Sequence, residues 1–201
     1  QTSHIDLATM KSTSGTRFFS SASSNTGRSL IGVGDVDGDG VNDFAIGAPW
    51  ATSVKGGALN AGILFVIYGH EQTTTTTTTS FWKNEFNLTS MIIQNKSLGR
   101  VIDGATSTRY VGMSACGLGD INQDGVGDIL VGSPNWSGQF GKAFIVFGRP
   151  REQVVTPLFV NDLNLSTGIE IIGETPSDYF GWSVDSGDWN SDGIIDIIIG
   201  A

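Results

Sequence analysis

The hydrophobic residues of this 201-residue chain fall in short runs and not at helical spacing. Residues 62–69 (Gly-Ile-Leu-Phe-Val-Ile-Tyr-Gly) and 141–148 (Gly-Lys-Ala-Phe-Ile-Val-Phe-Gly) are rich in β-branched and aromatic side chains and are bounded by glycine. Runs of this length, apolar on both faces, are typical of strands that are covered on two sides. The 28 glycines supply many tight turns between such runs. The pattern predicts an all-β chain of short strands.

A block of about 16 residues occurs three times. Gly34-Asp-Val-Asp-Gly-Asp-Gly-Val-Asn-Asp-Phe-Ala-Ile-Gly-Ala-Pro49 has counterparts at 119–134 and 187–201. Internal repetition at this period indicates stacked units that each contain a few strands. The second unit predicts four strands, near 112–118, 128–132, 142–147 and 170–172. Four short strands per repeat favour the blades of a β-propeller.

The repeats also predict how the chain is divided. We expect one partial propeller over 1–201, with about two full blades and parts of others. Its predicted parts are an outer strand near 16–22, a blade over about 26–104 with a Thr-rich insertion at 70–85, a blade over about 111–173, and the start of a next blade over 180–201.

Each copy contains an acidic loop with side-chain oxygens at loop positions 1, 3, 5 and 9 and a glycine after position 5. Alternate residues of a curled loop direct their side chains to one centre, and an apolar residue at position 7 offers only its backbone carbonyl. All-oxygen ligation favours a hard cation, and the loop favours Ca²⁺ over Mg²⁺. The predicted ligands of up to three calcium sites are Asp35, Asp37, Asp39, Val41 and Asp43; Asp120, Asn122, Asp124, Val126 and Asp128; and Asp188, Asn190, Asp192, Ile194 and Asp196.

The loops have two other interpretations. An EF-hand needs a bidentate Glu at position 12 and helices on both sides, whereas these loops have Ile46, Val131 and Ile199 there and predicted strands as flanks. A metal-free turn rich in Asp, Asn and Gly is the plainer alternative for any single loop. Three copies with the same spacing favour calcium.

Charge and composition exclude other classes of protein. The net charge is −9, with ten of the twenty acidic residues in the three loops, so nothing here suits a nucleic-acid phosphate backbone. No window of 18 apolar residues predicts a transmembrane helix. Only His4 and His70 could serve as imidazole bases, neither beside an evident nucleophile, and we predict no enzyme activity. Four sequons predict glycosylation and favour an extracellular or cell-surface location: Asn87, Asn95, Asn135 and Asn164.

The Phe180-Gly181 pair, the Asp-rich loops and Gly47-Ala48-Pro49 resemble the FG-GAP repeats of the integrin α-subunit β-propeller. Thr26-Gly27 and Val111-Gly112 replace Phe-Gly in the other copies. The resemblance implies a seven-bladed propeller, calcium in the loop between the first two strands of a blade, and a module for adhesion or ligand binding. A protein or glycan ligand and a second subunit would be its partners. A structural or carbohydrate-binding propeller attached to a secreted enzyme or lectin is the alternative.

Overall fold

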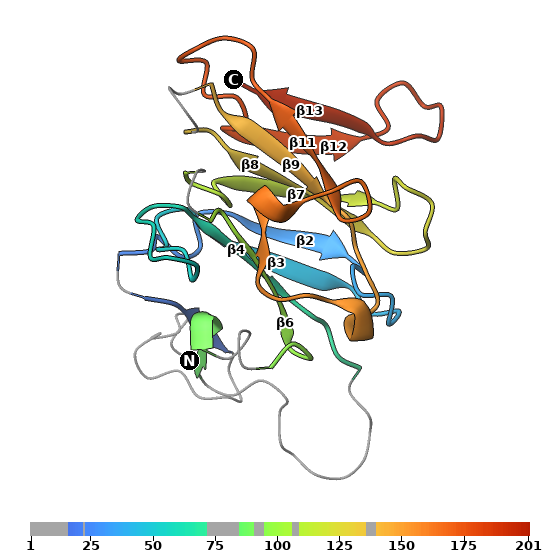
Figure 1. The fold of residues 1–201 in the computed structure, drawn as a ribbon. Coiled ribbons are helices and arrows are strands. Elements are labelled where there is room, and N and C mark those ends of the chain that lie inside the picture. Colours follow the sequence, from blue (N-terminus) through green and yellow to red (C-terminus); the bar gives the residue numbers. More distant parts are fainter. Residues whose placement is uncertain (1–15, 22, 72–84, 91–94, 106–108, 136–139) are drawn as a thin grey trace, which may run out of the picture.

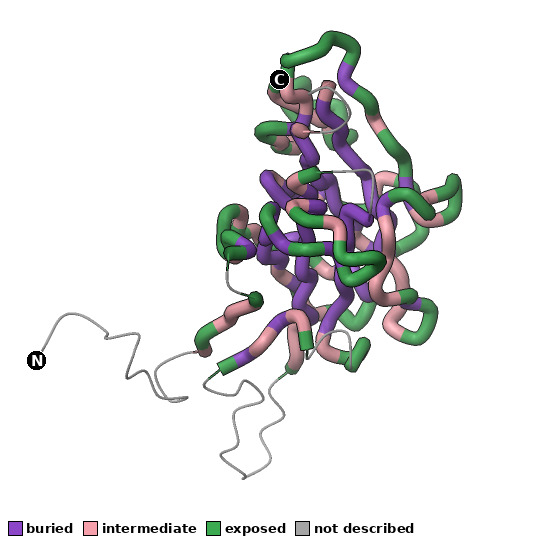
Figure 2. Tube along the Cα trace, turned by 60° about the vertical axis from the view of Figure 1, so that its left-hand side comes forward, coloured by how far each residue is buried: buried purple, intermediate pink, exposed green. Residues whose placement is uncertain are grey.

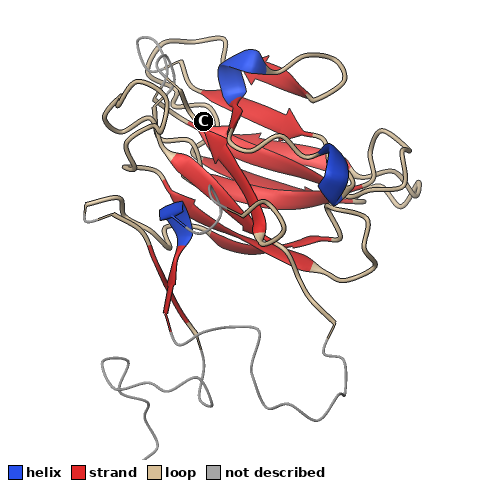
Figure 3. Ribbon diagram, turned by 60° about the horizontal axis from the view of Figure 1, so that its bottom comes forward, coloured by secondary structure: helices blue, strands red, loops and turns tan. Residues whose placement is uncertain are grey.

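The structure of the chain is a computed structural model that describes residues 16–21, 23–71, 85–90, 95–105, 109–135 and 140–201. Within them the regular secondary structure is mainly β-strand, which confirms the predicted fold class (Figure 3). The helical parts are the short 3₁₀ helices Arg151–Gln153 and Val160–Asp162 and a turn of helix at 88–90. Most of the predicted insertion at 70–85 lies outside the described residues. The strands are β1 (Arg17–Phe19), β2 (Leu30–Gly34), β3 (Asp43–Ala48), β4 (Ile63–Ile67), β5 (Glu85–Asn87), β6 (Gly99–Asp103), β7 (Ser114–Gly119), β8 (Asp128–Ser133), β9 (Lys142–Val146), β10 (Leu158–Phe159), β11 (Gly168–Ile172), β12 (Ser183–Gly187) and β13 (Asp196–Gly200).

Two antiparallel sheets follow the order that the repeats predicted. The first contains β2, β3, β4 and β6 in sequence order, and the second contains β7, β8, β9 and β11. Strands β12 and β13 pair as an antiparallel hairpin and repeat the inner half of these sheets. The four strands expected in the second repeat are therefore all present. Among the described residues no helix has the length and hydrophobicity needed to span a bilayer.

The sheets stack face to face, with the three inner strands β2, β7 and β12 next to one another (Figure 1). Val33, Leu64 and Ile129 belong to the apolar core that joins the first sheet to the second. Leu130 and Ile145 pack in a further cluster that includes Ile197 of the hairpin. The buried residues run through the middle of the strands and the exposed ones lie in the connecting loops (Figure 2). This arrangement explains why the strands are apolar on both faces.

Glycines of the repeated motif form the contact between successive sheets. A Cβ on Gly132 would lie 2.1 Å from the carbonyl oxygen of Gly181, and one on Gly47 would lie 2.0 Å from that of Gly112. Gly112 and Gly181 have φ of +81° and +88°, which glycine adopts without strain. The hydroxyl of Ser114 donates to the same Gly181 carbonyl at 3.0 Å. Glycine recurs at these places because two backbones meet there.

Two short strands cross from one sheet to the outer strand of the sheet before it, and the sequence did not predict them. Strand β10, in the connection between β9 and β11, pairs in parallel with β6. Strand β5, in the equivalent connection between β4 and β6, pairs in parallel with β1. By this equivalence β1 occupies the place of an outer strand, like β6, of a preceding sheet. The connection between the third and fourth strands thus fastens each repeat to its predecessor.

Candidate metal centres

Each acidic loop joins the first two strands of its repeat: β2 to β3, β7 to β8, and β12 to β13. All three loops project from the same side of the stack (Figure 1). In the first two repeats the strand register shifts just before the loop, between Gly32 and Gly34 and between Gly117 and Gly119. Such a bulge re-aims the chain at the end of a strand. The flanks are strands, which excludes the EF-hand interpretation.

Within each loop the side chain at position 1 accepts hydrogen bonds from the backbone of the following turn. Asp120 accepts the N–H of Asp124 at 3.0 Å and that of Gly125 at 2.7 Å. Asp188 accepts the equivalent groups of Asp192 and Gly193 at 3.0 and 2.8 Å. Asp35 does the same toward Asp39 and Gly40, at 3.1 and 2.8 Å. The three loops therefore share one hydrogen-bonding scheme, which curls each of them in the same way.

The aspartate at position 9 ties the loop to the rest of its sheet. Asp43, only 2% exposed, accepts the N–H of Val36 at 2.9 Å and that of Gly69, beyond the third strand, at 2.7 Å. Asp128 is fully buried and accepts the N–H groups of Ile121 and Gly148 at 3.0 and 2.9 Å. Burial raises the pKa of Asp43 to about 7, although these backbone donors oppose the rise. Burial likewise raises the pKa of Asp128.

Asp196 holds the corresponding place in the third loop and accepts the N–H of Trp189 at 3.1 Å. Its loop is the most exposed of the three, with Ile194 at position 7 exposed by 68%. Position 7 of the second loop, Val126, is instead buried. The apolar residue at this position contributes a backbone N–H to the loop scheme, since Ile194 donates to Asp192 at 2.8 Å.

The loops differ at position 3. In the second and third loops the amide of Asn122 donates to Asp124 Oδ2, and that of Asn190 to Asp192 Oδ2, each at 3.0 Å. The first loop has Asp37 there, so three carboxylates, those of Asp35, Asp37 and Asp39, lie with their oxygens within 4.8 Å of one another. Three acidic groups at that separation repel one another unless a cation compensates them.

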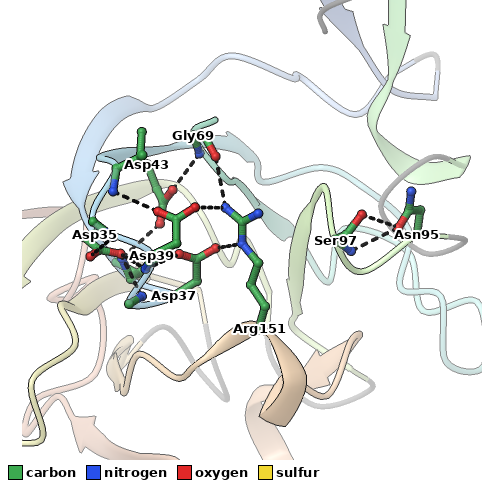
Figure 4. A network of polar contacts seen from close by, with 12 residues as sticks. Asp35, Asp37, Asp39, Asp43, Gly69, Asn95, Ser97 and Arg151 are labelled. Carbon is green, nitrogen blue, oxygen red and sulfur yellow. Dashed lines mark hydrogen bonds and ion pairs between the residues drawn. The ribbon is translucent and has the colours of Figure 1, made fainter. Parts of the chain in front are cut away.

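Arg151 supplies a positive charge to the first loop from the connection after β9 (Figure 4). Its Nε pairs with Asp37 Oδ2 and its Nη2 with Asp39 Oδ2, while Nη2 also donates to the Gly69 carbonyl at 3.0 Å. The guanidinium lies 5.0 Å from the centre of the Tyr68 ring. Arg151 thus gives Asp39 Oδ2 the donor that the position-3 asparagine gives the equivalent oxygen elsewhere. Burial raises the pKa of Asp37, and the Arg151 charge opposes that rise.

The donor chemistry of all three loops fits calcium. Each offers oxygen donors only, with carboxylates at positions 1, 5 and 9 and a carboxylate or amide oxygen at position 3. The structure brings together the predicted ligands Asp35, Asp37 and Asp39 of the first loop. The carboxylates at position 9 instead accept N–H groups from the loop and from beyond the third strand of the repeat. That these residues ligate a metal stays a prediction.

The predicted glycosylation sites differ in exposure. Asn95 and Asn164 are exposed, and their side-chain oxygens accept hydrogen bonds from the hydroxyls of Ser97 at 2.7 Å and Ser166 at 2.6 Å. Asn87 and Asn135 are half-buried, and the sequon of Asn135 continues into residues outside the described part.

Comparison with known protein families identifies the repeated unit. Residues 27–67 and 111–146 match the FG-GAP repeat. The chain therefore carries FG-GAP repeats, which imply a β-propeller, and the recognition of this class from the sequence is confirmed.

Among curated relatives, integrin alpha-PS2 of Drosophila melanogaster is 29% identical over 131 residues, which is 63% of this chain and 8% of that protein. Phosphatidylinositol-glycan-specific phospholipase D is 36% identical over 86 residues in Mus musculus and 34% in Bos taurus, or 41% of this chain. The match covers 10% of each phospholipase, so the chain corresponds to about a tenth of the length of these relatives. FG-GAP modules thus occur both in an integrin and beside an enzyme.

The acidic loops do not by themselves predict Arg151 or the role of Gly69 and Gly148. Arg151 lies 114 residues from Asp37 along the chain, and no local pattern marks it as a partner. The glycines, by contrast, close the apolar runs at 62–69 and 141–148, and their recurrence after each third strand is a signal that the sequence contains.

Proposed function

We propose that this chain is part of a calcium-stabilised FG-GAP propeller that serves as an extracellular ligand-binding module, as in an integrin α subunit. The observation that carries the proposal is the hydrogen-bonding scheme that the three loops share, in which the carboxylate at position 1 accepts N–H groups of the turn that follows it. The residues that would hold calcium are the side chains at positions 1, 3, 5 and 9 and the carbonyls of Val41, Val126 and Ile194. The ion supplies positive charge that offsets the repulsion between the carboxylates.

The protein's own residues would transmit this stabilisation into the sheets. Asp128 bonds both to its loop, through Ile121, and to Gly148 beyond β9. Asp43 makes the equivalent pair of bonds through Val36 and Gly69. A cation that favours the ionised form of these buried groups therefore strengthens hydrogen bonds to two parts of the repeat. The expected result is a rigid face of the propeller on the side where the loops project.

Terbium luminescence tests the calcium sites directly, because Tb³⁺ takes the place of Ca²⁺ and is excited by a nearby indole. Trp189 is position 2 of the third loop and is 51% exposed, and its backbone N–H donates to Asp196 Oδ2 at 3.1 Å. We expect tryptophan-sensitised emission that calcium suppresses by competition. Trp189→Phe should remove most of it, whereas Trp182→Phe, at the opposite end of β12, should leave it unchanged. Absence of sensitised emission, together with a calorimetric titration that detects no calcium binding, would refute the proposal.

The proposed ligand is a protein or glycan of the extracellular space, with a second subunit as a further partner, and we propose no catalytic step for these residues. Binding of the full-length protein to purified matrix proteins and to a glycan array, with calcium and after its removal, tests this. Calcium-dependent binding supports an adhesion module. No binding in either condition would contradict it.

The second candidate is a propeller attached to a secreted enzyme. Within the matched segments the chain is 36% identical to a phospholipase D and 29% identical to the integrin, and this difference favours the second candidate. The two candidates differ in the parent protein: adhesion predicts ligand binding by the propeller itself, whereas the alternative predicts loss of stability or localisation of an attached catalytic domain when the propeller is removed.

A further inference from the structure

Arg100 is a buried cation whose charge is not paired within the described structure. It lies in β6, where it is 3% exposed. Its Nη1 donates to the Phe147 carbonyl at 3.0 Å, but Nε and Nη2 have no hydrogen-bond partner among the described residues. None of the ion pairs in the described part of the chain involves it. A guanidinium removed from water without a counter-charge is strongly destabilising.

The nearest buried carboxylates do not fill this role. Asp128, Asp43 and Tyr68 interact electrostatically with Arg100 without a hydrogen bond to it. The oxygens of Asp128 are taken by the N–H groups of Ile121 and Gly148, and those of Asp43 by Val36 and Gly69. Their field moderates the positive charge of Arg100 without supplying an acceptor for its two remaining nitrogens.

Arg100 lines a small cavity beside the connection that runs from β9 to β11. This connection is fastened across β6 by the pairing of β10 and by a hydrogen bond of 2.9 Å from the Val101 N–H to Thr156 Oγ1. The cavity has a volume of about 30 Å³. Its polar lining comes from two arginines, Arg100 and Arg149, and from Gln153 and Thr167, with no acidic residue from the described structure. Val154 and Leu158 form apolar walls.

We propose that this cavity binds a single monatomic anion, chloride in physiological fluids, between Arg100 and Arg149. The charge of the lining selects an anion, since two arginines line the cavity and no carboxylate of the described residues does. The volume favours a small ion: a site for one water needs about 10–15 Å³, and the cavity offers about 30 Å³. The Gln153 amide is a neutral donor for the same ion, whereas the Thr167 hydroxyl already donates to the Asn164 carbonyl at 3.1 Å.

A chloride at this place would join two repeats. Arg100 belongs to the outer strand of the first sheet, and Arg149 begins the connection that leaves the second. Arg149 also donates its N–H to the Val36 carbonyl of the first acidic loop at 3.1 Å and its guanidinium to the Ser166 carbonyl. Bound chloride would therefore stabilise the packing of the second repeat on the first.

Bromide locates the ion without any variant. We expect crystals of the purified full-length protein grown in sodium bromide to give an anomalous difference peak within contact distance of the Arg100 and Arg149 side chains. Density for water alone in the cavity, with no anomalous signal, would overturn the proposal.

Thermal melts test the energetic consequence. At fixed calcium concentration and ionic strength, gluconate is replaced by chloride until the chloride concentration is ten times its Kd for the cavity. This replacement should raise Tm by about 3–5 °C. Arg100→Gln should remove this chloride dependence, and Lys96→Gln, which deletes an exposed positive charge, should retain it. Equal chloride dependence in both variants contradicts the proposal. If Arg100→Gln fails to fold, Arg149→Gln replaces it and should weaken chloride binding at least tenfold.

Discussion

Arg151 stabilises the first loop in the absence of calcium, because its guanidinium pairs with Asp37 and Asp39. Replacement of Arg151 tests that role. The side chain of Asp37 is 0% exposed, whereas Arg151 and Asp39 are exposed by 26% and 28%. In Arg151→Gln the buried carboxylate loses its counter-charge, while the partly exposed Asp39 loses less because water screens it. We expect a cost of about 2–3 kcal/mol without calcium, or a fall in Tm of about 4–12 °C.

The second and third loops suggest the matched background for this experiment. They carry Asn122 and Asn190 where the first carries Asp37, and neither shows an arginine partner in the described structure. Asp37→Asn removes the charge that Arg151 offsets, so Arg151→Gln should cost about 1 kcal/mol or less in that background. The difference between the two costs, about 1–3 kcal/mol, measures the coupling of the pair.

The assay is thermal melting of the four variants (native, each single and the double), with calcium removed and with saturating calcium. Calcium brings positive charge to the same carboxylates, so it should raise the Tm of Arg151→Gln more than that of the native protein. Arg28→Gln, at an exposed arginine, controls for loss of surface charge. An equal cost of Arg151→Gln in the native and Asp37→Asn backgrounds would refute the reasoning, as would no cost in the calcium-free native protein.

Three further predictions concern the titration of the loops, the contact between sheets and the sequons. Burial raises the pKa of Asp43 to about 7, above its usual 3.8, so protonation of this carboxylate favours the folded state. The stabilisation is complete below about pH 4 and is lost as the pH rises to about 7. The Tm of the calcium-free protein should therefore fall between about pH 5.5 and 8. Calcium should offset this fall, Asp43→Asn should flatten it, and a calcium-free Tm that rises over this range would contradict it. Gly132→Ala should cost about 2–3 kcal/mol in a chemical-denaturation titration, because its Cβ would meet the Gly181 carbonyl at 2.1 Å, whereas Gly32→Ala, with nothing within 4 Å, should be nearly neutral. Mass spectrometry of the secreted protein should show that Asn95→Gln and Asn164→Gln each remove one glycan and that Asn87→Gln removes none. A glycan on Asn87 and none on Asn95 and Asn164 would show that exposure in the folded chain does not decide which sequons are used.

The repeated elements of the fold could be predicted from the sequence because they depend on local patterns. Apolar runs such as 141–148 are bounded by glycines, and the acidic loops recur with constant spacing. The strands at 142–146 and 128–133 follow from those runs and loops. Repeated sequence motifs form repeated strands and loops, because the same position of each repeat packs against the same kind of neighbour.

The contacts that are made once could not be predicted in this way. Strand β10 has only two residues, Leu158 and Phe159, and pairs because β6 presents a free edge to it. Arg151 and Arg100 depend on how the connection after β9 crosses the first sheet. Neither has a local signal: one arginine meets carboxylates more than 100 positions away, and the other is buried in a strand, Gly99–Asp103, whose residues are all buried although two of them are charged. Tertiary packing, and not propensity, decides both.

The single difference among the loops indicates how such a repeat diversifies. With asparagine at position 3, as in Asn122, the loop carries its own donor for the neighbouring carboxylate and is self-sufficient. With Asp37 it carries one more negative charge and depends on Arg151 from the next repeat. The extra carboxylate should strengthen attraction for a divalent ion, and the nearby guanidinium should weaken it, so the two changes oppose each other in affinity. The Asp37 carboxylate and the Arg151 guanidinium together form an ion pair between the two repeats, which holds the first loop to the second repeat even before calcium binds.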